Sequence, residues 1–244
     1  MLSRIMLILP GCFAVGAVFM FLANRHVSSM TKRRRWLKFA SYAVIVLGVL
    51  ACAALGRGWL TGLMLAIFFA GLYELGKTTR HFSIGPLLMV WVIYVLLMLG
   101  SVSSARLVAP ATFAYTYLIV AAFDGFSQVV GQFLGKHPLV PLLSPTKTVE
   151  GFCGGITAAV IVGLLFRGLT TLPAGSAATA ALAISACALA GDLAASWVKR
   201  RAGIKDFSRL LPGHGGVLDR FDSFIGATGL LAPALILLTN RGLV

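Results

Sequence analysis

Long apolar runs separated by short polar loops dominate the hydrophobic pattern of this chain. A helix needs about 20 apolar residues to cross the hydrocarbon core of a bilayer. Runs near this length predict eight transmembrane helices, at residues 3–23, 37–55, 59–76, 84–103, 107–135, 152–172, 176–198 and 222–239. The fifth run is longer than a bilayer requires, so we expect that helix to be tilted, kinked or extended beyond the membrane. The pattern therefore predicts an all-α, polytopic integral membrane protein.

Composition agrees with this fold class. The chain is 59% hydrophobic and only 11% charged, whereas a soluble domain carries about 25% charged residues. The formal net charge of +14 would suit nucleic acid, but the basic residues lie in short loops between apolar runs rather than on one soluble face. We therefore expect no nucleic-acid partner and assign the positive charge to membrane topology and to anionic ligands.

The loops carry their charges asymmetrically. Sixteen of the 21 basic residues fall in the first, third, fifth and seventh loops: Arg25, Lys32, Arg33, Arg34, Arg35, Lys38, Lys77, Arg80, Lys136, Lys147, Lys199, Arg200, Arg201, Lys205, Arg209 and Arg220. Loops rich in lysine and arginine stay in the cytoplasm, which predicts that both termini are on the other side. All seven acids and all four histidines border or lie in these same loops. The titratable chemistry is therefore expected at the cytoplasmic face.

Asp124 begins a polar stripe on the fifth predicted helix. Asp124, Ser127 or Gln128, Gly131 and Gly135 recur at helical spacing and share one face. Small residues of this kind let membrane helices pack closely, while an acid within a span usually has a functional role. The stripe can be a packing seam, the wall of a polar cavity, or both.

The loop from Ser144 to Gly151 reads Ser-Pro-Thr-Lys-Thr-Val-Glu-Gly. Its hydroxyls, backbone N–H groups and Lys147 could hold a phosphate. Thr146 or Thr148 could equally be an N-cap of the sixth helix. Gly151 and Gly155 are four apart, so they predict close packing of that helix.

The segment from Asp192 to Asp222 is the richest in candidate chemistry. Asp192, Ser196 and Lys199 share one helix face, and Asp219 and Asp222 are three residues apart. Carboxylates that converge beside lysines and arginines suit a hydrated Mg²⁺ that holds a triphosphate. The other interpretation is a charged, solvated loop beneath a membrane helix.

This segment resembles the signature of the phosphatidate cytidylyltransferase (CDP-diacylglycerol synthase) family. The matching residues are Ser196, Lys199, Arg200, Lys205, Asp206, Pro212, His214, Gly215, Gly216, Asp219, Arg220 and Asp222. The loop from Ser144 to Gly151 is similar to a second conserved stretch of the family. The resemblance covers roughly residues 120–225, so we expect N-terminal transmembrane helices at 1–106 and a catalytic membrane core at 107–244. Where the family has a tyrosine and a basic residue after the aspartate, this chain has Ser127-Gln128 and then Gln132, which is typical of a divergent branch.

The resemblance implies that the phosphate of phosphatidate attacks the α-phosphorus of CTP and that pyrophosphate leaves. On this basis we expect Asp192, Asp219 and Asp222 to bind Mg²⁺, as one ion or two, with K⁺ as a candidate further cation. Phosphate contacts are expected from Lys199, Arg200, Lys205 and Arg220, assisted by Ser144, Lys147, Ser196, His214, Gly215 and Gly216. Asp124 and Glu150 would shape the cavity or orient a basic residue. The implied assembly is a homodimer in a bacterial inner membrane, with its active site facing the cytoplasm.

Other functions compete with this interpretation. A CTP-dependent lipid kinase, or a cytidylyltransferase acting on another lipid phosphate, would use similar groups. A transporter would need charges near the bilayer midplane and access from both faces, and the one-sided distribution of acids argues against it. An inactive scaffold would have no need for the complete set of carboxylates.

Overall fold

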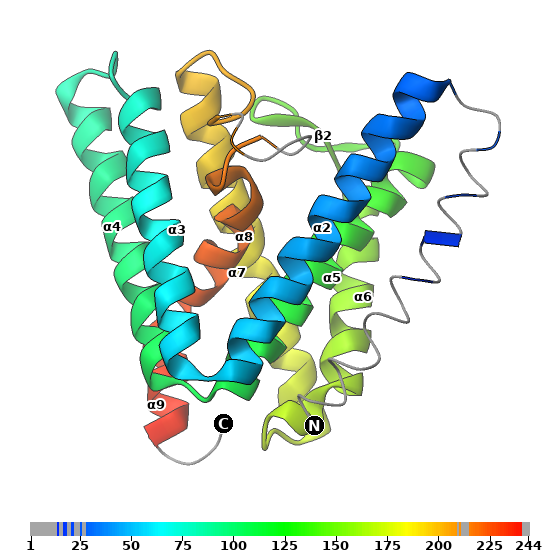
Figure 1. Ribbon diagram of the computed structural model, residues 1–244, viewed down its shortest axis with the longest axis vertical. Helices are drawn as coiled ribbons and strands as arrows, with labels where there is room; N and C mark the ends of the chain where they lie inside the picture. Colours follow the sequence, from blue (N-terminus) through cyan, green and yellow to red (C-terminus); the bar gives the residue numbers. More distant parts are fainter. Residues whose placement is uncertain are drawn as a thin grey trace.

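The computed structural model describes residues 28–208, 210 and 215–240, together with residues 14, 17, 18, 21 and 25. Most of the predicted first span, 3–23, lies outside the described residues. The helices are α2 (Ser29–Leu55), α3 (Arg57–Thr78), α4 (Ile84–Leu107), α5 (Pro110–Leu134), α6 (Val149–Leu165), α7 (Ala174–Arg201), α8 (Leu218–Leu230) and α9 (Ala232–Asn240) (Figure 1). A 3₁₀ turn, Arg167–Leu169, follows α6.

The described helices confirm a polytopic integral membrane fold. Five of them, α2, α3, α4, α5 and α7, are long and apolar enough to cross a bilayer. A sixth span is obtained if α8 and α9, which meet at a bend of 51°, are counted together. Helix α6 has 17 residues and is shorter than these. The described residues therefore support five or six spans, and the predicted count of eight is not confirmed.

The loops alternate between two ends of the helix bundle. Figure 1 shows the α3–α4, α5–α6 and α7–α8 connections at one end, and the α2–α3, α4–α5 and α6–α7 turns at the other. We call the first of these the loop end. Helix α8 packs against α7 and α4, and also contacts α3 and α5. The helices of the predicted N-terminal segment therefore contact those of the predicted catalytic core, and the division at residue 106 stays a prediction.

The last predicted span is not one straight helix. The sequence predicts it over 222–239, but α8 begins at Leu218 and the helix breaks at Leu231. Pro233 lies in the first turn after the break. Proline lacks an N–H and clashes with the carbonyl four residues earlier, so a continuous helix is disfavoured here. The earlier start places Asp219 and Asp222 on the first turns of α8.

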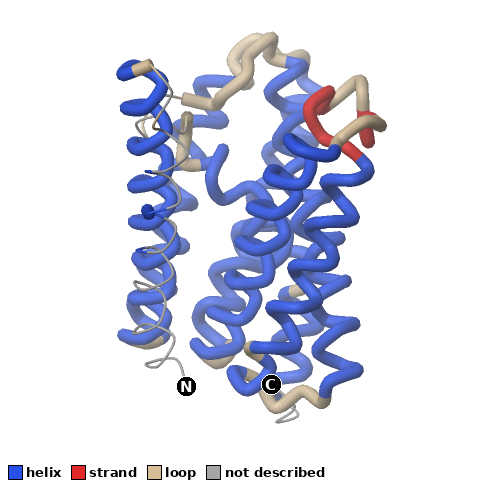
Figure 2. The backbone as a smooth tube through the Cα atoms, turned by 90° about the vertical axis from the view of Figure 1, so that its right-hand side faces the viewer, coloured by secondary structure: helices blue, strands red, loops and turns tan. Residues whose placement is uncertain are grey.

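The α5–α6 connection contains a small β-hairpin that the sequence analysis did not predict. Strands β1 (Pro138–Val140) and β2 (Ser144–Thr148) pair antiparallel, and the hairpin lies at the loop end (Figure 2). The Thr148 hydroxyl accepts the N–H of Gly151 at 3.1 Å, so the N-cap predicted for α6 is confirmed at Thr148.

Helices α5 and α6 approach closely along small residues, as the glycines predicted. A Cβ added to Gly151 would lie 2.6 Å from the Ser127 carbonyl oxygen, and one added to Gly155 would lie 2.7 Å from that of Phe123. Helix α8 is held against α5 by an aromatic contact, since the ring centroids of Phe113 and Phe224 are 5.2 Å apart. This packing fixes the helices that carry the polar residues described below.

We expect Gly155→Leu to destabilise the protein, because the new side chain would overlap the backbone of α5. Overpacking of this kind costs about 1–3 kcal/mol. Thermal unfolding of the detergent-purified protein measures the effect. Gly175→Ala is the matched control, because a Cβ there meets nothing within 4 Å. Equal stability of the two variants would contradict the packing described for α5 and α6.

Candidate active site

A polar cavity of about 550 Å³ opens among α5, the β-hairpin, α7 and α8. Charged and hydroxyl-bearing residues from separate parts of the sequence line it: Asp124, Ser127, Gln128, Gln132, Ser144, Thr146, Lys147, Thr148, Asp192, Lys199, Asp206, Asp219, Arg220, Asp222 and Ser223. The two stretches that the sequence analysis singled out, around Lys147 and from Asp192 to Asp222, therefore meet in one place.

Close packing of α7 on α8 brings two of the acids into this cavity. A Cβ added to Gly191 would lie 2.5 Å from the Asp222 carbonyl oxygen and 2.8 Å from the Cα of Gly226. The two helix backbones are therefore in contact next to Asp192 and Asp222. Larger side chains at these glycines would separate the two helices and with them the two carboxylates.

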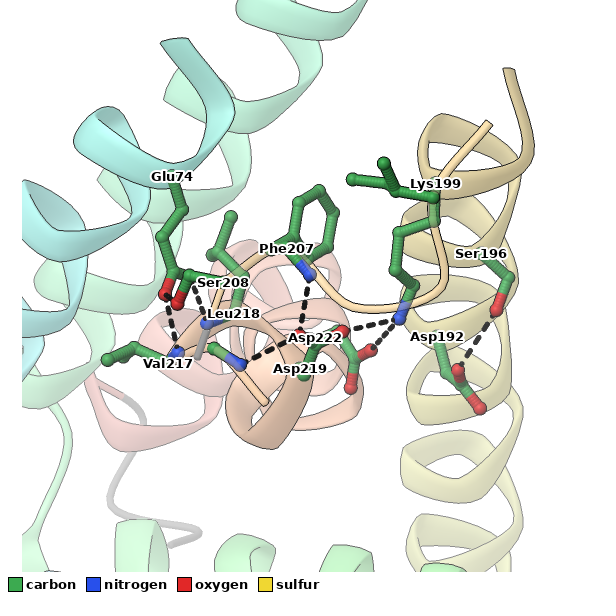
Figure 3. Close-up of polar contacts among 12 residues, drawn as sticks. Glu74, Asp192, Ser196, Lys199, Phe207, Ser208, Val217, Leu218, Asp219 and Asp222 are labelled. Carbon is green, nitrogen blue, oxygen red and sulfur yellow. Dashed lines mark hydrogen bonds and ion pairs between the residues drawn. The ribbon is translucent and has the colours of Figure 1, made fainter. Parts of the chain in front are cut away.

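Ion pairs organise the charges in the cavity. The Lys147 ammonium pairs with Asp192, and Lys199 Nζ lies 2.7 Å from Asp219 Oδ1 and 3.9 Å from Asp222 Oδ2. Figure 3 shows Lys199 reaching from α7 towards both aspartates of α8. Each lysine is thus held beside the cavity, where it could exchange a carboxylate for a phosphate oxygen.

Asp219 also anchors the loop before α8. Its Oδ2 accepts the N–H of Phe207 at 2.8 Å and the N–H of Gly216 at 2.9 Å (Figure 3). Gly215 has φ of +84°, a conformation that favours glycine. The carboxylate therefore joins Lys199, the loop and the start of α8 into one unit.

The polar stripe on α5 serves both roles that its sequence left open. Asp124, Ser127 and Gln128 line the cavity, and Gly131 packs against Thr148 and Gly151 at the seam with α6. The Ser127 hydroxyl is buried without a hydrogen-bond partner among the described residues. This hydroxyl lies against Gly155 of α6, at the seam between the two helices.

Burial lowers the pKa of the Lys147 ammonium below its usual value, while the nearby charges of Asp124 and Asp222 oppose this effect. A desolvated ammonium gains more from a new anionic partner than one in water does. The position of Lys147 therefore suits a phosphate group in the cavity.

Several predicted site residues lie elsewhere. Arg200 is exposed, and its guanidinium donates to the carbonyls of Leu143 and Ile204 at 3.2 and 3.3 Å. Lys205 is exposed and does not line the cavity. His214 lies outside the described residues. The phosphate contacts assigned to these three side chains stay predictions.

Three further residues of the predicted set have structural partners. Ser196 is buried and donates to Asp192 Oδ1 at 3.4 Å. Glu150 accepts the N–H of Lys136 at 3.0 Å and contacts the His137 ring at 2.5 Å, which ties the hairpin to α6. Gly216 packs against a carboxylate of α3, described below, rather than against the cavity.

The donor chemistry of the cavity fits a hard divalent cation, because Asp192 and Asp222 both present carboxylate oxygens to it. Within the described residues, however, no three acidic, histidine or cysteine side chains are grouped closely enough to hold a metal ion. The carboxylates are engaged by lysines and N–H groups instead. A cation could be accommodated if Lys147 and Lys199 turned to phosphate oxygens, and the predicted Mg²⁺ site stays a prediction.

The sequence analysis named Thr146, Gln132 and Asp206 but assigned none of them to the site, and it did not name Ser223; all four line the cavity. Thr146 directly precedes Lys147 on β2, and Gln132 lies one helical turn after Gln128 on α5. Glu74 was noted only as one acid among seven, and its contacts, described below, are with residues more than 130 positions away. An isolated acid in an apolar helix is the signal that could have identified it.

A second, apolar cavity of about 260 Å³ adjoins the polar one. Helices α3, α4, α7 and α8 form it, and its walls include Ile93, Leu97, Ala195 and Trp197. Asp222 lines both cavities. A carboxylate at the boundary thus separates an apolar volume among membrane helices from a highly charged one.

Comparisons with known proteins identify relatives of this chain. The profile of the cytidylyltransferase family matches residues 3–238. A phosphatidate cytidylyltransferase of Brucella abortus is 46% identical over 121 residues, which cover 49% of this chain and 45% of the relative. The protein of the same name from Staphylococcus epidermidis is 41% identical over 124 residues, which cover 50% and 48%. The chain therefore aligns with about half the length of these curated relatives.

We expect Lys199→Met to lower the stability of the ligand-free protein, because it leaves Asp219 buried without its cationic partner. Removing one member of a buried ion pair typically costs about 3–5 kcal/mol. Chemical or thermal unfolding in detergent provides the measurement. Lys77→Met is the matched control, since Lys77 is exposed on α3. A stability loss no larger than the control's would show that the ion pair is not a structural centre of the site.

Proposed function

The chain belongs to the cytidylyltransferase family, and we propose that it transfers the cytidylyl group of CTP to phosphatidate. The products are CDP-diacylglycerol and pyrophosphate. The observation that carries this proposal is the polar cavity, where Lys147, Lys199, Arg220 and the carboxylates meet beside an apolar cavity. The charged cavity suits the triphosphate of CTP and the phosphate of the lipid, and the apolar cavity suits an acyl chain.

The reaction that we propose needs charge compensation more than proton transfer. An oxygen of the phosphatidate phosphate forms a bond to the α-phosphorus of CTP. The bond from that phosphorus to the oxygen bridging the α- and β-phosphates breaks, and pyrophosphate leaves with the electron pair. Both reactants are anions, so the lysines and Arg220 reduce their repulsion and stabilise the charge that develops on the leaving group.

Mg²⁺ is part of the proposal. Asp192 and Asp222 would hold it, with Asp219 as the third carboxylate of the set. When bound, Mg²⁺ supplies Lewis-acid stabilisation of the phosphate oxygens. Lys147 and Lys199 would then pair with phosphates, because a cation takes over their carboxylates.

The apolar cavity supports a lipid as the acceptor. It lies among α4, α7 and α8, and Ile93 at its wall is 44% exposed on the outer face of α4. An acyl chain there would remain among membrane helices while the phosphate reaches the polar cavity beside Asp222. We further propose that the loop end faces the cytoplasm of a bacterial inner membrane, where CTP is available, and that the protein works as a homodimer.

Pyrophosphate release tests the proposed reaction. Detergent-purified protein is given CTP, phosphatidate and Mg²⁺, and Asp222→Asn is assayed in parallel. We expect pyrophosphate and CDP-diacylglycerol from the unmodified protein and a loss of at least about 100-fold in the variant, because it removes a carboxylate that would hold the Mg²⁺ needed to stabilise the developing charge. Lys77→Met serves as the control and should retain activity.

The products also separate the alternatives. Release of CDP instead of pyrophosphate would replace the proposal with a lipid kinase. No turnover with phosphatidate, under conditions in which another phosphatidate cytidylyltransferase is active, would indicate a different lipid phosphate as the acceptor.

Filling the apolar cavity should weaken use of the lipid selectively. We expect Ala195→Trp to raise the KM for phosphatidate on the order of tenfold, because the indole competes for the acyl volume. The KM for CTP should change little. Val92→Trp is the matched control, because Val92 is 55% exposed on α4 and does not line the cavity. A parallel rise in both KM values would contradict an acyl site in this cavity.

A further inference from the structure

Glu74 is a fully buried acid on α3, outside the polar cavity. It is the only acidic residue in the first 123 positions of the sequence. The described residues place no lysine or arginine at ion-pair distance from it. The partners that the described residues give it are hydrogen-bond donors, which a buried carboxylate requires.

The hydrogen bonds come from the loop that precedes α8 and from the start of that helix. Glu74 Oε1 accepts the N–H of Val217 at 2.9 Å, and Oε2 accepts the N–H of Leu218 at 2.8 Å. The Ser208 hydroxyl donates to Oε1 at 2.5 Å. Figure 3 shows Glu74 pointing from α3 into this helix terminus. One carboxylate thus joins α3 to Ser208 and Val217 in the loop and to Leu218 at the start of α8.

The N-cap residue of α8 has no capping side chain. Val217 occupies that position, is apolar and makes no side-chain cap hydrogen bond. Gly216 cannot supply a cap either, and a Cβ added to it would lie 2.5 Å from Glu74 Oε1 and 2.8 Å from Oε2. The carboxylate therefore occupies the space beside Gly216, one residue before the N-cap, where a side chain would otherwise lie.

Two carboxylates accept the three successive N–H groups at the entry to α8, those of Gly216, Val217 and Leu218. Asp219 accepts the N–H of Gly216, and Glu74 accepts those of Val217 and Leu218. Negative charge is favourable at a helix N-terminus, where free N–H groups point outward. The first two turns of α8 carry Asp219 and Asp222, so the orientation of both depends on this terminus.

We propose that Glu74 is a positioning residue of the active site, a cap supplied from α3 that fixes the N-terminus of α8 and thereby Asp219, Asp222 and their partner Lys199. Its effect on turnover rests on the proposed function. Its effect on the α8 terminus does not, so the two can be tested separately.

Hydrogen–deuterium exchange tests the structural part without any substrate. Glu74→Gln keeps one acceptor oxygen but turns an NH₂ group towards one of the two N–H donors. We expect exchange in the 215–222 segment to become faster on the order of 10- to 100-fold, the effect of losing one hydrogen bond to a charged group. Thr79→Val is the control, because Thr79, the buried C-cap of α3, uses its hydroxyl for a hydrogen bond to the Leu75 carbonyl of the same helix. Unchanged exchange in Glu74→Gln would overturn the proposal.

A double-mutant cycle tests whether Glu74 acts through the space at Gly216. The Gly216 backbone does not have a positive φ, so it can accept a side chain. We expect Gly216→Ser to speed exchange at the α8 terminus in the unmodified protein, because its side chain meets the carboxylate. In the Glu74→Ala background the same serine has room and offers a replacement cap, so it should restore part of the protection. Additive effects of the two substitutions would overturn the proposal.

Kinetics test the link to the site. In Glu74→Gln we expect kcat for pyrophosphate release to fall about 10-fold or more, because Asp219 and Asp222 on the first turns of α8 would lose their fixed positions. Glu74→Asp, which keeps the charge, should recover part of the rate. If exchange rises while kcat stays at the unmodified value, the positioning role is refuted. If the unmodified protein shows no turnover at all, the proposed function fails. Hydrogen–deuterium exchange in the double-mutant cycle still decides whether Glu74 fixes the start of α8.

Discussion

The Lys199–Asp219 ion pair is the contact on which the rest of the site depends. Only 12% of the lysine side chain and 3% of the aspartate side chain are exposed, so each charge requires the other. The aspartate also accepts the N–H groups of Phe207 and Gly216. The pair therefore joins α7, the loop and α8, and the remaining charges are arranged around it.

This arrangement suits a reaction between two anions at a membrane surface. In the described structure the lysines neutralise the aspartates, which keeps a charged cavity stable among apolar helices. A cation and a triphosphate could enter together by exchanging these partners, with the cation at the carboxylates and the lysines at phosphate oxygens. The adjoining apolar cavity lies among helices long and apolar enough to span a membrane, and Asp222 lines both cavities.

The sequence predicted those features that depend on local spacing. Asp192 and Ser196 are hydrogen-bonded on one face of α7, as their separation indicated, and Thr148 caps α6. It did not predict contacts that depend on distant segments. Arg200 belongs to the same motif but binds the carbonyl of Leu143 in the hairpin. The role of Glu74 required knowing that α3 passes beside the start of α8, and helical periodicity carries no information on such pairings.

The most direct test of the account is a crystal structure of the protein with CTP and Mg²⁺ bound. We predict that the triphosphate lies in the polar cavity, that Lys147 leaves Asp192 to contact a phosphate oxygen, and that the start of α8 keeps its place against Glu74. A nucleotide bound elsewhere, or one bound in the cavity with the Lys147–Asp192 pair intact, would contradict the exchange of partners that the account requires.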